Sequence, residues 1–421
     1  MPNWPRSTTT LCAALLLSAC NAALPASPAD GGAPLDGPAA DLASPYPAPF
    51  PPVPQVVNDN GGPVLATPLL VPVFFKNFDP ALRVKLLDFL ARVGATDYWK
   101  QTTSEYGVGP ATVTDPVDLV ESATGTIESG VITAWLAAKL NKDDPAFPAP
   151  TDQTIYVLHY PGAVSITMNN NGTIASSCDS FGAYHGDLRL DSNHGYQTVA
   201  YAVMPTCARF GARTGLDAFT SSESHELIEA ATDPYPRNDP GFSSPDADHE
   251  YWAFLLGGGE AADLCAQDPL AFTRFSELPY VVQRSWSNKA AAAGHDPCVP
   301  ALPNEVYFNA APVLADTVTL AGQITLPGVQ LAVGQQKSIP IELWSDGPTS
   351  GPWTVTVRDA ATLLGMPASL SLRLDKTSGQ NGDVLNLTVK VQSASQLGAG
   401  LFMVQSKLGT VTHTSFGIVA P

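Results

Sequence analysis

The sequence predicts an α/β or α+β domain over residues 62–303, followed by an all-β immunoglobulin-like sandwich over residues 304–421. In the first region, apolar stripes with helical spacing alternate with nearly continuous apolar runs, which are typical of buried strands. In the second region, short runs of alternating apolar and polar residues are separated by Gly, Pro, Asn and Asp, as in a sandwich of short strands. The second region contains no cysteine, so its core depends on packing alone.

The first twenty residues form a leader, with Arg6, an apolar run over 11–17 and the sequence Leu-Ser-Ala-Cys ending at Cys20. A basic start, a short apolar stretch and small residues before a cleavage point are typical of a secretory signal, and the stretch is too short to span a bilayer. Leu-Ser-Ala-Cys resembles a bacterial lipobox, which implies a signal peptide over 1–19 and a lipid on Cys20. We therefore expect an extracytoplasmic lipoprotein, anchored to the membrane through Cys20 and displayed on the outer membrane or cell surface.

Residues 20–61 are rich in proline and alanine, and such a segment buries too little apolar surface to order itself. We predict a disordered, semi-stiff stalk above the lipid. The whole chain holds 21 basic and 39 acidic residues, for a net charge of −18. Nucleic-acid binding requires a basic surface, so we expect no nucleic-acid partner.

In the first domain, residues 64–75 are predicted to form a strand, for which Pro68 and Pro72 favour an edge or bent course. Asp79 is expected to cap a helix that ends at Gly94. Further elements are predicted from apolar spacing: a helix over 126–140 and strands over 152–160, 199–204 and 280–288, with His159 a satisfied core or surface histidine.

The segment 222–234, Ser-Glu-Ser-His-Glu-Leu-Ile-Glu-Ala-Ala-Thr-Asp-Pro, is predicted to form a short helix around which the site is organised. Thr220 and Glu223 have the spacing of a capping box at its start. His225 and Glu229 are four residues apart, so they project from one face of the helix. This is the pattern of a zincin helix with glutamate in place of the second histidine. It predicts His225 and Glu229 as zinc ligands and Glu226 as the base that deprotonates the attacking water.

A third ligand is expected from Glu260 or Asp263, which lie in or beside the Gly-rich loop 257–259. His185, next to Gly186, is expected to point into the site and to stabilise a developing oxyanion. A rival cluster for calcium consists of Asp246, Asp248 and His249, although acidic turn residues are most often simply solvated. A buried hydrogen-bond network without metal is the alternative interpretation of the helix.

Four cysteines remain after Cys12 in the leader and Cys20 are set aside. An even number of cysteines in an oxidising compartment predicts two disulfides. Three pairings are possible. We favour Cys178 with Cys207 and Cys265 with Cys298, because each pair closes a local loop; a four-cysteine metal site lacks any Cys-x-x-Cys spacing.

Four short passages, in the same order, resemble the phosphate-induced protein family, also called Exordium-like, over roughly residues 62–300. The resemblance implies a secreted or cell-surface protein and a shared fold for the first domain. It implies no biochemical activity, and plant members that lack the histidine and glutamate show that the fold can be kept without the site. The passages are Ile155–Leu158 with 176–186, His225–Pro234, Glu260–Cys265 and 286–288 before Cys298.

Two functions follow as expectations. The first is a surface-anchored lipoprotein with a zincin-like zinc site that hydrolyses peptide bonds outside the cell. The alternative is a non-enzymatic envelope or cell-surface binding protein, with a peptide or a cell-envelope polymer as partner and a structural polar or metal site. A serine hydrolase using Ser222 or Ser224 is a distant third, because no Gly-x-Ser-x-Gly sequence surrounds them. The C-terminal module suggests adhesion or spacing.

Overall fold

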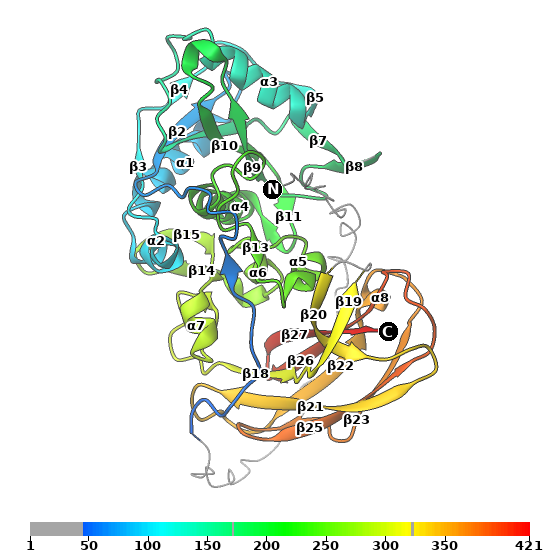
Figure 1. Cartoon of the computed structure of the whole chain (residues 1–421). Helices are drawn as coiled ribbons and strands as arrows, with labels where there is room; N and C mark the ends of the chain where they lie inside the picture. The colour runs from blue at the N-terminus through cyan, green and yellow to red at the C-terminus, as the bar shows by residue number, and fades with distance from the viewer. Residues whose placement is uncertain (1–44, 171, 321–323) are drawn as a thin grey trace.

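The computed structural model describes residues 45–170, 172–320 and 324–421. In this part the chain is predominantly β-sheet, with a first domain and a β-sandwich that contact each other (Figure 1). The predicted signal peptide 1–19, the lipidated Cys20 and the first part of the stalk lie outside the described residues. Among the described helices, none is long and apolar enough to cross a membrane.

A mixed sheet with the strand order β3-β2-β6-β10-β9 forms the centre of the first domain. Strands β2, β6 and β10 run parallel, while β9 pairs antiparallel with β10 and forms one edge. Every residue of β6 is buried, as expected for a central strand covered on both faces. The strands are β2 (Leu69–Phe74), β3 (Thr112–Val113), β6 (Thr154–Tyr160), β9 (Tyr184–Arg189) and β10 (Thr198–Pro205), with β4 (Val117–Asp118) beside β2.

Strand β2 is a central strand, so the edge course predicted for it is wrong. It pairs with β6 on one side and with two short strands on the other. Strand β3 pairs with residues 69–70 and β4 with residues 73–74, so the partner changes around Pro72. Proline has no N–H to donate, and the break between β3 and β4 lies where that donor is missing.

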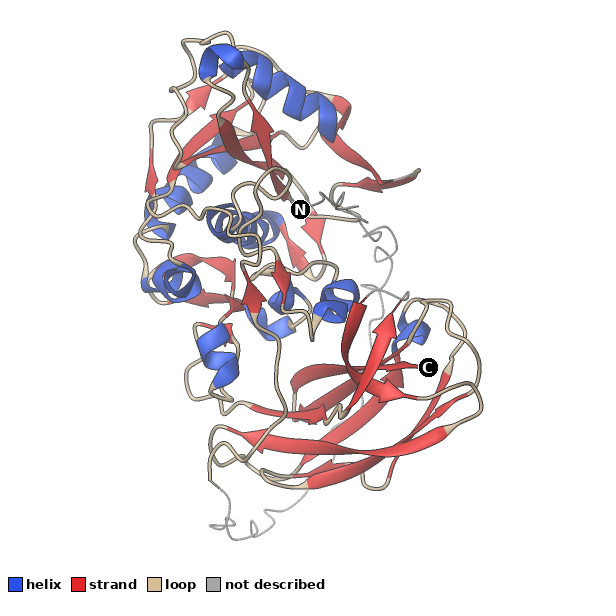
Figure 2. Cartoon of the chain, in the orientation of Figure 1, coloured by secondary structure: helices blue, strands red, loops and turns tan. Residues whose placement is uncertain are grey.

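Helices cover both faces of the sheet (Figure 2). Along β6, Ile155 and Val157 face the core shared with α1, α2 and α4, while Tyr156 and Leu158 face the core shared with α3. Asp79 caps α1 as predicted, since its side chain accepts a hydrogen bond from the N–H of Leu82. The helices are α1 (Pro80–Val93), α2 (Asp97–Thr103), α3 (Ser129–Leu140) and α4 (Gly215–Thr232).

Helix α4 begins at Gly215, so the predicted capping box is wrong. Thr220 lies inside the helix, and its hydroxyl donates to the carbonyl oxygens of Val281 and Leu216, at 2.7 and 3.1 Å. Glu223 is fully buried, and its Oε1 lies 2.8 Å from Nε2 of His159, which is therefore a satisfied core histidine. The helix therefore begins before the predicted segment 222–234, and its additional residues include Phe219, which is buried in the core. Packing in the core stabilises this start of the helix, and capping signals in the sequence do not indicate such packing.

Shorter elements complete the first domain. A three-stranded sheet consists of β5 (Gly125–Glu128), β7 (Val164–Asn170) and β8 (Thr173–Ser176). Three two-stranded pairs are β11 (Arg209–Phe210) with β12 (Arg213–Thr214), β14 (Phe272–Phe275) with β15 (Leu278–Gln283), and β16 (Ser285–Trp286) with β17 (Cys298–Val299). The short helices are α5 (Glu250–Leu256), α6 (Asp263–Ala266) and α7 (Asn288–Ala292), and the 3₁₀ turns are η1 (Ser104–Tyr106), η2 (Ser192–His194) and η3 (Pro269–Ala271). Both predicted disulfides, Cys178–Cys207 and Cys265–Cys298, are confirmed.

The C-terminal region is a two-sheet, immunoglobulin-like sandwich, which confirms the prediction for residues 304–421. Trp353, Phe402 and Leu343 are completely buried between the sheets. One sheet contains β18 (Phe308–Pro312), β21 (Gln336–Ser345), β25 (Val384–Val391) and β23 (Leu370–Leu374). The other contains β19 (Asp316–Leu320), β20 (Ile324–Gln330), β27 (Val411–Ala420), β26 (Gly400–Leu408), β22 (Trp353–Asp359) and β24 (Ser378–Gly379), and α8 (Ala360–Leu363) follows β22.

Residues 45–57 are ordered, so the predicted disordered stalk is wrong over this stretch. The ring of Phe50 stacks on Trp344 with centroids 5.0 Å apart, and the N–H of Ala48 donates to Oδ1 of Asn381. Strand β1 (Val56–Val57) then pairs with β13 (Ser244–Pro245) of the first domain. Apolar residues between the prolines pack against the surfaces of the two domains. The composition of the segment alone does not indicate that such surfaces are available. This segment therefore contacts both domains.

The two domains share an apolar interface. The ring of Trp252, on α5, meets Phe416 of β27 edge to face at 4.8 Å. The hydroxyl of Tyr251 donates to the carbonyl oxygen of Phe416 at 3.2 Å. Both side chains of the first domain are buried in one cluster with residues of the sandwich, so the domains form a joint core.

Candidate metal centre

Three segments far apart in the sequence bring their polar side chains to one place: β9, α4 with its C-terminal cap, and the region around the start of α6. Strand β9 supplies His185, and helix α4 supplies its central histidine and glutamates. The C-terminal cap of α4 supplies Asp233, and the loop leading into α6 supplies two more carboxylates. Together they form three overlapping groups, and within each group the ligand atoms lie within 4.8 Å of one another. The groups are His225, Glu229 and Asp263; His185, Glu226 and Glu229; and His185, Asp233 and Glu260.

In the first group, the imidazole of His225 lies between two carboxylates. Nε2 of His225 lies 3.0 Å from Oε2 of Glu229 and 3.5 Å from Oδ1 of Asp263. Ligand atoms in a tetrahedral zinc site lie about 3.4 Å apart, given zinc–ligand distances of about 2.1 Å. Both distances from Nε2 of His225 are close to this spacing, so the three side chains could hold a metal ion, and Asp263 rather than Glu260 is the neighbour of His225 and Glu229.

Gln283, at the end of β15, fixes the proton on His225. Its amide nitrogen donates to the carbonyl oxygen of Ala262 at 2.6 Å, so its Oε1 faces His225 and accepts from Nδ1 at 3.1 Å. A neutral His225 with its proton on Nδ1 has a lone pair on Nε2, the atom that faces Glu229 and Asp263. Metal-ligating histidines characteristically donate their other N–H in this way.

The loop before α6 brings Asp263 close to the helix. A Cβ atom at Gly258 would lie 1.8 Å from Oδ2 of Asp263, so only glycine allows the carboxylate this position. The N–H of Asp263 donates to Oε1 of Glu229, at 3.2 Å, which leaves Oε2 of Glu229 facing the histidines. Backbone and side chain of Asp263 thus both contribute to the first group.

His185 lies between carboxylates, which differs from the oxyanion-facing position expected for it. Its Nδ1 is 3.3 Å from Oε2 of Glu226 and 3.7 Å from Oε2 of Glu229. Its Nε2 is 3.4 Å from Oε1 of Glu260. The side chain is only 6% exposed, so it contacts the acidic residues of the cluster and has little contact with solvent.

Burial and mutual charge shift the pKa values of the cluster. Burial would lower the pKa of His225, but the charges of Glu229 and its neighbours outweigh it and hold that pKa well above 6.5. Burial raises the pKa of Asp263 to about 7, with a further contribution from the charge of Glu229. Burial also raises the pKa of Glu260 well above its ordinary value. Concentrated negative charge in a buried site favours the binding of protons or cations.

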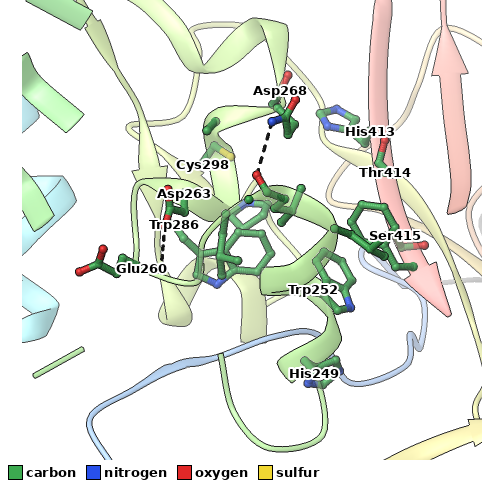
Figure 3. Close-up of a pocket in the computed structure, with 18 of the residues that line it drawn as sticks. His249, Trp252, Glu260, Asp263, Asp268, Trp286, Cys298, His413, Thr414 and Ser415 are labelled. Atoms are coloured by element: carbon green, nitrogen blue, oxygen red, sulfur yellow. Dashed lines mark hydrogen bonds between the residues drawn. The ribbon is translucent and has the colours of Figure 1, made fainter. Parts of the chain in front are cut away.

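The cluster opens into a cleft of about 1290 Å³ that reaches both domains. Its lining includes every cluster residue except the buried Asp233, together with Trp252 of the first domain and His413 and Ser415 of β27. Figure 3 shows Glu260 and Asp263 on one side of this region, and His413, Thr414 and Ser415 on the other side of Trp252. A substrate longer than the cluster could therefore contact the sandwich as well.

Two other predicted sites form no such arrangement. Asp246 accepts hydrogen bonds from His249 Nδ1 at 2.8 Å, from the N–H of Gln55 and from the N–H of Asp248, so these residues stabilise a turn and the N-terminal segment. Ser224 donates to the carbonyl oxygen of Ser221 and accepts from the N–H of Gln283. The contacts of Ser224 are structural, so the geometry supports neither the calcium cluster nor Ser224 as the nucleophile of a serine hydrolase.

Asp233 and Gln283 belong to the site but were not recognised in the sequence. Asp233 stands before a proline, a position typical of the end of a helix. Gln283 follows two valines in a predicted strand, and a polar residue at a buried strand position was the one available signal. Their partners come from other parts of the chain, so no local pattern could have assigned their roles.

Comparisons with known proteins leave the function open. No family model and no curated protein matches the chain. Among solved structures, the crystal structure of the titin M3 domain is 14% identical with a TM-score of 0.16, covering 22% of this chain and 84% of that chain. A chimeric titin Z1Z2 is 14% identical with a TM-score of 0.15, covering 27% and 95%. A twitchin kinase fragment from C. elegans with immunoglobulin domains is 17% identical, with a TM-score of 0.15, covering 27% and 19%. Membership of the phosphate-induced protein family stays a prediction.

Proposed function

We propose that this chain is a lipid-anchored, extracytoplasmic, zinc-dependent hydrolase of peptide bonds with a zincin-like site. The observation that carries the proposal is the contact between Gln283 and Nδ1 of His225, which directs Nε2 of His225 toward Glu229 and Asp263, where all three side chains could bind one cation. His225, Glu229 and Asp263 would hold the zinc, which supplies Lewis acidity to the substrate carbonyl and to the attacking water.

Glu226 is the proposed general base and acid. It follows His225 directly, so it projects from a neighbouring position of α4, and it lines the same cleft. It accepts the proton of the attacking water and passes it to the leaving amine. Nδ1 of His185, 3.3 Å from Oε2 of Glu226, holds this carboxylate in place, so His185 acts as a positioning residue in the proposal.

A peptide substrate is favoured by the strand beside the cluster. His185 belongs to β9, the edge of the central sheet, and among the described strands none pairs with its outer side. An unpaired strand edge can offer backbone donors and acceptors to an extended chain. The long cleft that continues to the sandwich also suits an extended peptide better than a small molecule.

The proposal is tested by zinc content and peptide cleavage measured on the same preparations of the purified chain. Wild type and Glu226→Gln are expected to contain zinc, and His225→Ala to have lost the zinc held by Glu229 and Asp263. Glu226→Gln is expected to cleave a random peptide library about 10²–10⁴-fold more slowly than wild type. Wild-type cleavage by Glu226→Gln would overturn the assigned base, and a wild type that binds no zinc would overturn the hydrolase.

The alternative, a non-enzymatic envelope protein, is favoured by one observation. Nε2 of His225 and Oε2 of Glu229 are 3.0 Å apart, so a protonated histidine pairs with this carboxylate without any metal. In that case the cluster is a buried ionic network that stabilises the fold. Zinc content separates an ionic network from a metal site, and peptide cleavage separates the hydrolase from a binding protein with a structural metal.

A further inference from the structure

Three buried polar atoms next to the proposed zinc site lack hydrogen-bond partners. They are Nε2 of His185, Oδ2 of Asp233 and Oε1 of Glu260. The same three residues form one of the groups whose ligand atoms lie within 4.8 Å of one another. Asp233 is completely buried, and the side chains of His185 and Glu260 are 6% and 17% exposed. The three atoms therefore share one small buried region, in which Nε2 of His185 and Oε1 of Glu260 form an ion pair at 3.4 Å and Oδ2 of Asp233 has no hydrogen-bond partner.

Buried polar atoms that lack a hydrogen bond of good geometry are costly. A buried donor or acceptor without a partner costs about 1–3 kcal/mol, and more when the group is charged. A single cation among the three atoms would satisfy all of them at once. We propose that His185, Asp233 and Glu260 bind a second divalent cation, distinct from the one assigned to His225, Glu229 and Asp263.

The surrounding contacts leave these atoms available. Oδ1 of Asp233 accepts a hydrogen bond from the N–H of Gly241 at 2.7 Å, so the other oxygen faces the cluster. Nε2 of His185 and Oε1 of Glu260 are 3.4 Å apart, which is the spacing of two ligand atoms around zinc. The three residues come from a strand, a helix cap and a loop, so their convergence is not the by-product of one acidic turn.

The charge of the cluster favours two cations over one. The three groups contain five carboxylates and two imidazoles. One divalent cation would compensate two of the five negative charges, and a second would compensate two more. Buried carboxylates require such compensation, because uncompensated charge is strongly disfavoured at low dielectric.

The donor set indicates the class of metal. One imidazole nitrogen with two carboxylate oxygens suits Zn²⁺ or a similar transition-metal ion, whereas calcium prefers oxygen ligands alone and more of them. Fewer than four protein ligands leave a position open for water. Zn²⁺ is therefore the probe of choice.

Occupation of the second site would also position Glu226; this part of the inference rests on the proposed function. A cation on Nε2 requires the proton of neutral His185 to reside on Nδ1. That atom lies 3.3 Å from Oε2 of Glu226, so the N–H is directed at the proposed base. The second cation would thereby fix the tautomer of His185 and the orientation of Glu226.

The test is zinc stoichiometry, measured by elemental analysis and by competition with a chromophoric chelator. Wild type is expected to bind two zinc ions per chain. Glu260→Gln and Asp233→Asn are each expected to bind one, His225→Ala one, and the double variant His225→Ala/Glu260→Gln none. Asp246→Asn, which removes an acidic residue of a different turn, is the matched control and is expected to keep two.

Circular dichroism identifies variants that fail to fold. Asp233→Asn changes a side chain that accepts a hydrogen bond from the N–H of Gly241, so it could alter the backbone as well as the site. Glu260→Gln avoids this problem, because the Glu260 side chain accepts no hydrogen bond from a backbone group among the described residues. One zinc in wild type and one in folded Glu260→Gln would overturn the second site, and Asp233 and Glu260 would then share a proton. Two zinc ions in a wild type whose Glu226→Gln variant cleaves peptides normally would overturn the proposed base while keeping the second site.

Discussion

Oε1 of Gln283 lies 3.1 Å from Nδ1 of His225, and this contact decides which nitrogen of the histidine faces the acidic cluster. The amide cannot turn over without losing its hydrogen bond to the carbonyl oxygen of Ala262. A residue on a neighbouring strand thereby fixes the tautomer of a residue on α4. The first prediction follows from this relationship.

Replacing Gln283 by alanine should weaken zinc binding about 10–100-fold, because His225 loses the acceptor that orients it. Affinity is measured by competition with a chromophoric chelator at a fixed pH. Ser222→Ala, which changes another residue of α4 that lines the cleft, serves as the control and should bind zinc like wild type. Equal affinity in Gln283→Ala and wild type would show that the contact plays no part in the site.

The metal-free protein should be less stable at pH 8 than at pH 6. Burial, followed by the charge of Glu229, raises the pKa of Asp263 from 3.8 to about 7 in the folded chain, so the folded state binds this proton more tightly than the unfolded state. Stability therefore falls as the pH rises from about 4 through 7.

His185 and His225 add to this trend. Burial opposes their protonation, but the surrounding carboxylates outweigh it and raise both pKa values well above 6.5. Their stabilisation is complete below pH 6.5 and is lost as the pH rises through the raised values. Thermal melts in chelator should give a lower Tm at pH 8, and added zinc should raise the Tm more at pH 8 than at pH 6. A higher metal-free Tm at pH 8 would contradict the assignment.

The Trp252→Ala variant should uncouple the two domains. The indole packs edge to face on Phe416 of the sandwich, and removing a buried aromatic side chain of this size costs about 3–5 kcal/mol. Calorimetry should show one cooperative transition for wild type and two for the variant. Val84→Ala, at a side chain that is 62% exposed, should leave a single transition.

The two disulfides should differ in their effect on metal binding but not on stability. They close loops with sequence separations of 29 and 33 residues, so removing either should cost about 4 kcal/mol of loop-closure entropy. Cys265 lies on α6 together with Asp263, so Cys265→Ser/Cys298→Ser should also weaken zinc binding. Denaturant unfolding and chelator competition on both pairs of variants provide the comparison; equal zinc affinity in the two would contradict it.

Local patterns determined a large part of this protein. The four-residue spacing of His225 and Glu229 placed both on one face of a helix, whatever the rest of the chain does. The alternation of apolar residues after residue 304 indicated a sandwich. The even number of cysteines indicated two disulfides, and their short separations favoured the pairing found in the structure over the two others. These features depend on neighbours within a few tens of residues, where backbone geometry restricts the outcome.

Tertiary packing decided the composition of the site. Glu260 lies with His185 and Asp233, whereas Asp263 lies with His225 and Glu229. Tertiary packing also recruited Gln283 from a strand and folded the proline-rich residues 45–57 onto both domains. Each of these outcomes depends on side chains from distant segments meeting in a buried region, where an unpaired charge or donor is costly. No sequence spacing encodes that encounter, because it arises only when the sheet, helix α4 and the loop before α6 pack together.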